Sequence, residues 1–118
     1  MILIRKEIMD ALGQSAWTDF ARRLVAFLQG QFPDAAEQPR ESLVKGVRGQ
    51  IAAARGYGMV TEQDIAIYVT SAWLLGGEFD REFPAVAEMM ASEAPPETKA
   101  EWLEEFTNEV FEGLESGK

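Results

Sequence analysis

Apolar residues recur along most of this chain at intervals of three and four, the spacing that places them on one face of a helix. The clearest stripe begins after Ser15, which can act as an N-cap, and ends at Phe32-Pro33, because the residue before a proline disfavours helical geometry. A shorter helix is predicted over 5–12 and is expected to end at Gly13. No stretch alternates as a strand would, so the pattern predicts an all-α fold. The members of the clearest stripe are Trp17, Phe20, Ala21, Leu24, Phe27 and Leu28.

The middle of the chain predicts a polar loop over 34–39 and a helix over 39–57. Gly46 and Gly49 lie inside that helical pattern, where each glycine costs up to about 1 kcal/mol relative to alanine. We therefore expect them to allow the close approach of a neighbouring helix. Gly58 is expected to adopt the left-handed conformation that ends helices. The expected inner face consists of Leu43, Val44, Val47, Ile51 and Ala54.

The next helix is predicted over 62–75, with Thr61 as its cap and two acidic residues in its first turn, where the helix dipole favours them. Val60 and Ile65 have the spacing of a hydrophobic staple. The helix is apolar on nearly every side, which is typical of a helix in the centre of a bundle. Gly76 and the glycine after it are expected to end it.

The last third of the chain contains a turn with Phe79 and Phe83, followed by a short helix over 84–91. The final helix is predicted over about 97–114, after a pair of prolines that includes Pro96. Its expected apolar face consists of Trp102, Leu103, Phe106, Val110 and Leu114.

The composition limits both the architecture and the chemistry. A length of 118 residues with 47% hydrophobic side chains predicts one domain over 1–118, a bundle of about five to six helices with the helix over 62–75 at its centre. There is no cysteine, so disulfides and thiolate metal sites are excluded. There is no histidine either, which removes the commonest general base near neutral pH and the commonest metal ligand. We therefore expect a protein that is not an enzyme and has no catalytic residue, cofactor or metal.

The negative charge is concentrated at one end of the chain. Residues 1–77 hold 8 acidic and 8 basic side chains, whereas 78–118 hold 12 acidic and 3 basic ones, which accounts for the whole net charge of −9. This excess is either a solubilising surface or a docking surface for a basic partner. It opposes binding to nucleic acid and to anionic membranes. No apolar run reaches the length of a membrane span and no signal peptide is recognisable, so a cytoplasmic location is expected.

The candidate contact residues combine aromatic and acidic side chains. Tyr68 and Trp73 lie on the central helix and are expected in the core, whereas aromatic residues in the turn and on the last helix are candidates for a contact surface. The candidate protein-binding set is Phe79, Phe83, Trp102, Phe106, Glu101, Glu104, Glu105, Glu109 and Glu112.

Other charged groups favour structural roles. The glutamates of the last helix have spacings found in di-metal bundles, but such bundles also use histidine. Asp80 and Glu82 could hold a hard cation weakly, although acidic residues in turns are more often structural. A set of basic residues could pair with the protein's own acidic helix or with an acidic partner. These are Arg22, Arg23, Lys45, Arg48 and Arg55.

A sequence resemblance covers roughly 20–90. Its signature is Arg55-Gly56-Tyr57-Gly58, then Thr61-Glu62-Gln63-Asp64, then Gly76-Gly77-Glu78-Phe79-Asp80. In this order the chain resembles a family of small helical bacterial proteins that are often encoded beside type VI secretion effectors, their spike-tip proteins and their loading chaperones. The family implies no catalytic residues. Many relatives carry histidines near the end of the second helix, where this chain has Gln29 and Gln31.

The resemblance implies an accessory factor, a co-chaperone or adaptor that helps to load or stabilise an effector. Its partner would be the effector, its chaperone or a spike-tip protein, and self-association as a homodimer is left open. Two other functions are open at this point. One is an immunity protein that neutralises a toxin, and the other is a small enzyme that uses carboxylates.

Overall fold

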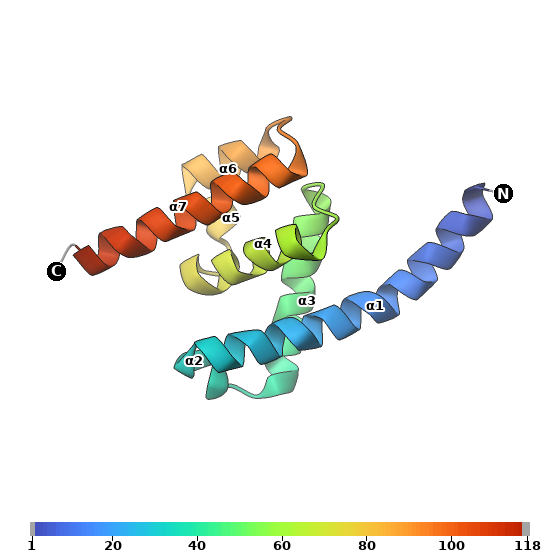
Figure 1. Ribbon diagram of the computed structural model, residues 1–118, viewed down its shortest axis with the longest axis horizontal. Coiled ribbons are helices and arrows are strands. Elements are labelled where there is room, and N and C mark those ends of the chain that lie inside the picture. Colours follow the sequence, from blue (N-terminus) through green and yellow to red (C-terminus); the bar gives the residue numbers. More distant parts are fainter. Residues whose placement is uncertain (1, 117–118) are drawn as a thin grey trace. The chain divides into compact units, whose positions relative to one another are not determined.

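The computed structural model describes the backbone of residues 2–116 and the side chains of residues 17–110. Every regular element in this part of the chain is a helix, which confirms the all-α prediction (Figure 1). In chain order the helices are α1 (Ile2–Gln31), α2 (Pro33–Ala36), α3 (Arg40–Gly56), α4 (Glu62–Leu75), α5 (Phe79–Glu82), α6 (Pro84–Ala91) and α7 (Pro96–Ser116).

The chain forms two compact units, Met1–Gly49 and Gln50–Lys118, and the division between them falls within α3. The first unit contains α1, α2 and the beginning of α3. The second contains the end of α3 and the four helices that follow. The arrangement of all helices in one domain stays a prediction.

In the first unit, α1 is one continuous helix of 30 residues. The predicted break at Gly13 and the predicted cap at Ser15 are therefore wrong. A single glycine weakens a helix by about 1 kcal/mol, which is too little to end one that continues for several turns on both sides. The predicted end is confirmed, because Phe32 is extended, with φ −125° and ψ 118°, and Pro33 starts the next helix.

The stretch predicted as a polar loop after α1 begins instead with α2, a single helical turn with Ala35 buried. Gln29 ties this turn to α1, because its Nε2 donates hydrogen bonds to the carbonyl oxygens of Ala35 and Gln38, each at 3.3 Å. The prediction of a loop over 34–39 is thus wrong for its first residues. The apolar side of a short turn was not visible in a stretch dominated by polar residues.

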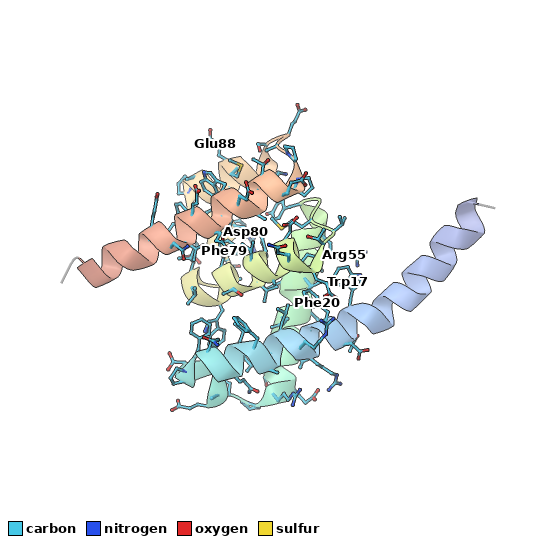
Figure 2. The ribbon with its side chains drawn as sticks, in the orientation of Figure 1. Trp17, Phe20, Arg55, Phe79, Asp80 and Glu88 are labelled. Carbon is cyan, nitrogen blue, oxygen red and sulfur yellow. The ribbon has the colours of Figure 1, made fainter. Side chains whose placement is uncertain are left out.

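The stripe on α1 is buried as predicted, except at one edge. Phe27 is 49% exposed, whereas Val25, which was not predicted, is fully buried. Trp17 is half-buried and lies beside Phe20 (Figure 2). The two rings meet edge to face with 5.7 Å between their centroids, and the guanidinium of Arg23 lies 5.3 Å from the Phe20 centroid. The remaining stripe residues that are buried are Phe20, Ala21, Leu24 and Leu28.

The predicted inner face of α3 is confirmed, since all five of its apolar residues are buried. Gly46 and Gly49 are exposed, and a Cβ atom added to either would meet nothing within 4 Å. The expectation that these glycines allow a helix to approach closely is therefore wrong for the described structure.

Replacing Gly46 or Gly49 by alanine is expected to raise the free energy of unfolding by up to about 1 kcal/mol each, because alanine has the higher helix propensity. Gly58→Ala is the control and should destabilise, since Gly58 has a φ of +95° that alanine rarely adopts. Denaturant unfolding followed by far-ultraviolet circular dichroism measures all three. Loss of stability in both Gly46→Ala and Gly49→Ala would mean that a neighbour does pack on these glycines.

The start and end of α4 follow the prediction closely. Thr61 is extended and its Oγ1 accepts a hydrogen bond from the Asp64 amide at 3.1 Å. Gly76 ends the helix with a φ of +115°. The staple between Val60 and Ile65 is not formed, because Val60 is 73% exposed, and Met59 is the buried residue before the cap.

In the second unit, α4 packs along α7, while α6 packs on α5 and α7 (Figure 1). Tyr68 is fully buried as predicted, whereas Trp73 is half-buried. A polar pair joins the two long helices, since Thr107 Oγ1 lies 2.9 Å from Ser71 Oγ and both residues are buried. Other buried residues here include Ile65, Val69, Ala72, Val86, Met90, Ala100 and Leu103.

Lys99 is a buried cation on α7, only 7% exposed, that sequence analysis did not single out. Its Nζ donates to the Met90 carbonyl at 2.8 Å and lies 3.4 Å from the Tyr57 carbonyl. These two carbonyls lie near the C-terminal ends of α6 and α3, where helix carbonyls lack partners and the helix dipole favours positive charge. Lys99 therefore connects three helices of the second unit.

Candidate functional site

Phe79, one of the four aromatic candidates, belongs to the core. Its side chain, labelled in Figure 2, is fully buried. Its ring lies 5.0 Å from that of Tyr68. The turn that carries it is helical, and α5 directs this first residue inward. The prediction that Phe79 lies on a contact surface is therefore wrong.

The other three aromatic candidates come together in the second unit. Trp102 and Phe106 lie one turn apart on α7, with rings nearly parallel at 10° and 5.1 Å between centroids. Phe83, at the junction of α5 and α6, meets Phe106 edge to face at 5.5 Å and 80°. Each of the three side chains is half-buried. We call Phe83, Trp102 and Phe106 the aromatic cluster.

Four acidic candidates with described side chains all lie on the exposed side of α7. None of them forms an ion pair or a side-chain hydrogen bond with another residue whose side chain is described. They are Glu101, Glu104, Glu105 and Glu109. The side chain of Glu112 lies outside the described residues.

Helical spacing divides these acidic residues into two pairs. Glu105 follows Trp102 by three positions, and Glu109 follows Phe106 by three, so both carboxylates lie beside the aromatic cluster. Glu101 and Glu104 lie further round the helix, away from the cluster. We call Glu105 and Glu109 the acidic edge.

Asp80, which could have held a cation, is occupied by a structural contact. Its Oδ2 accepts a hydrogen bond from the Tyr57 hydroxyl at 2.6 Å. This hydrogen bond, together with burial and the negative charge of Asp80, raises the pKa of Tyr57 to about 12. Glu82 is exposed, and within the described residues no group of three or more acidic side chains could hold a metal ion.

Tyr68 presents a different environment from Tyr57. Its hydroxyl is buried and has no hydrogen-bond partner among the described residues. Burial, followed by the charge of Asp80, raises the pKa of this hydroxyl far above its ordinary value. The hydrogen bond between Tyr57 and Asp80 connects the first and last segments of the sequence signature, 55–58 and 76–80. The sequence alone did not pair these two residues.

The basic candidates are divided between the two units and make different contacts. Arg22 lies 3.7 Å from Glu41, and Arg23 lies over the Phe20 ring. Lys45 and Arg48 are exposed and line an open depression on α3. Arg55 belongs to the second unit and is also exposed.

No protein-family model, curated protein or solved structure matches this chain. Among the described helices, none combines the length and the apolar character that crossing a membrane requires.

Proposed function

We propose that this chain is a non-catalytic accessory factor that binds another protein through the aromatic cluster. The observation that carries the proposal is the half-burial of three rings, of which Phe106 contacts both Phe83 and Trp102. Other large side chains of the same unit, such as Phe79, are fully buried. Aromatic side chains supply a large contact area for little loss of conformational entropy, and tryptophan is enriched among the residues that dominate binding energy.

The role that fits the resemblance over 20–90 is that of a co-chaperone or adaptor, acting in the cytoplasm on a type VI secretion effector, its chaperone or its spike-tip protein. A single bundle around α4 is part of this proposal. The aromatic cluster lies largely on α7, beyond the resembling region. Partner choice would therefore depend on a part of the chain that the resemblance does not cover.

Co-expression with the products of neighbouring genes tests the role. We expect one of them to co-purify with the wild-type chain, and the Trp102→Ala/Phe106→Ala variant to lose more than about tenfold in affinity, as for a binding hot spot. Phe27→Ala is the matched control, since Phe27 is an exposed aromatic residue on the first unit. Equal capture by a folded Trp102→Ala/Phe106→Ala variant, or no capture at micromolar concentration, would contradict the proposal.

A second function is supported by the four exposed glutamates of α7 that have no partner among the described side chains. An acidic surface of this kind suits an immunity protein that covers the basic active site of a nuclease toxin. Deleting the gene separates the two functions. Immunity predicts that the producing cell is poisoned by its own toxin, whereas an accessory factor predicts loss of effector delivery without self-poisoning.

A further inference from the structure

The acidic edge lies against the aromatic cluster, yet no described cation neutralises it. Glu105 and Glu109 are exposed and four positions apart, a spacing at which like charges destabilise a helix by a few tenths of a kcal/mol. The ion pairs between Arg22 and Glu41 and between Glu78 and Arg81 lie elsewhere. A positive charge supplied from outside the chain would relieve this repulsion.

The aromatic cluster selects among possible cations. An aromatic ring has a negative face, which attracts a cation placed over it, most strongly over tryptophan. Arginine can stack its planar guanidinium on such a ring while its N–H groups reach a carboxylate, whereas lysine provides a compact and strongly hydrated charge. Trp102 with Glu105, and Phe106 with Glu109, repeat the same pair of a ring and a carboxylate one helical turn apart.

We propose that the aromatic cluster and the acidic edge together bind a basic protein segment that carries two arginines one helical turn apart. Each guanidinium lies against one ring and one carboxylate, and two arginines four positions apart on a helix have the same spacing as the two pairs on α7, about 6 Å along the axis. The proposal rests on the proposed function, because it names the chemistry of the partner at the same surface.

The overall charge favours this partner over others. Residues 78–118 carry 12 acidic and 3 basic side chains, which repels nucleic acid and acidic proteins and steers a basic segment toward α7. The contact is therefore expected to weaken as salt is added.

The test uses the full chain and a defined helical peptide with two arginines four positions apart in an alanine and glutamine background. Matched peptides carry two lysines or two glutamates at the same positions. Calorimetry measures affinity, and the indole N–H signal of Trp102 in an NMR spectrum reports contact at the cluster. Two variants change the net charge equally, Glu105→Lys/Glu109→Lys at the acidic edge and Glu101→Lys/Glu104→Lys away from it, so they separate local contact from general attraction.

We expect the arginine peptide to shift the Trp102 signal and to bind about tenfold more weakly to Glu105→Lys/Glu109→Lys, with a much smaller change for Glu101→Lys/Glu104→Lys. The lysine peptide should bind several-fold more weakly than the arginine peptide, and the glutamate peptide should not bind. Equal weakening by both pairs of substitutions, or no arginine binding up to about 1 mM, would overturn the proposal. A Trp102 shift that follows the protein's own concentration would indicate a second copy instead, and would also overturn it.

These outcomes distinguish a failure of this inference from a failure of the proposed function. If Trp102→Ala/Phe106→Ala loses a co-purifying partner but the arginine peptide does not bind, the surface binds protein and the inference about basic segments fails. If the peptide binds but no neighbouring gene product is captured, the surface has the stated chemistry and the accessory role fails.

Discussion

Phe79→Ala is expected to lower the free energy of unfolding by about 3–5 kcal/mol, the usual cost of removing a buried aromatic ring and leaving a cavity. Phe79 is fully buried and its ring contacts that of Tyr68, so the substitution removes core contacts and leaves a cavity. Denaturant unfolding of the variant, compared with the wild type, measures the loss.

Phe83→Ala is the matched control, because Phe83 is the same residue type four positions later and only half-buried. We expect it to cost clearly less stability than Phe79→Ala, and to weaken partner binding instead. A loss below about 1 kcal/mol for Phe79→Ala would mean that Phe79 is not a core residue.

Tyr57→Phe is expected to lower the free energy of unfolding by about 1.5–3 kcal/mol, because it removes a hydrogen bond to the charged carboxylate of Asp80. Tyr68→Phe removes the same atom from a buried hydroxyl without a described partner, so it should be neutral or slightly stabilising. The comparison isolates the hydrogen bond, since both variants lose one hydroxyl from a tyrosine. Equal losses of stability in the two variants would contradict the account.

The same contact predicts how stability depends on alkaline pH. The folded state holds the Tyr57 proton more tightly than the unfolded state does, with a pKa of about 12 against an ordinary value of 10.0. The stabilisation is therefore complete below about pH 10 and is lost as the pH rises toward 12. Tyr57→Phe should lose less stability than the wild type over this interval. Because the chain has only 2 tyrosines and both pKa values are raised, tyrosinate absorbance that appears around pH 10 in the folded protein would contradict the prediction.

Much of the helical pattern was predictable, because several helices carry local signals at both ends. Thr61 and Gly76 bound α4, and prolines start α6 and α7, so these elements could be read from capping and backbone chemistry alone. The continuity of α1 through Gly13 was not predictable in the same way, since a glycine lowers helix propensity without forbidding the helix.

The candidate site was predictable as a set of residues but not as a surface. Phe79 and Phe83 occur in one turn and look alike in sequence, yet only the path of α5 decides that the first is core and the second half-buried. The spacing along α7 already distinguishes the acidic edge from Glu101 and Glu104. Whether the acidic edge lies beside a binding surface depends on where the rings of Trp102 and Phe106 lie. Their position is set by packing, because Phe106 contacts both Trp102 and Phe83.

Site-specific photo-cross-linking tests the central claim, protein binding through the aromatic cluster, most directly. A photoreactive phenylalanine analogue is placed in the producing cell at Trp102, and in a matched chain at Glu104, which lies on the same helix but away from the cluster. We expect the position of Trp102 to cross-link to the same gene product that co-purifies with the wild-type chain, and the position of Glu104 to give little or no product. Equal cross-linking from both positions, or cross-linking from Glu104 alone, would contradict the claim.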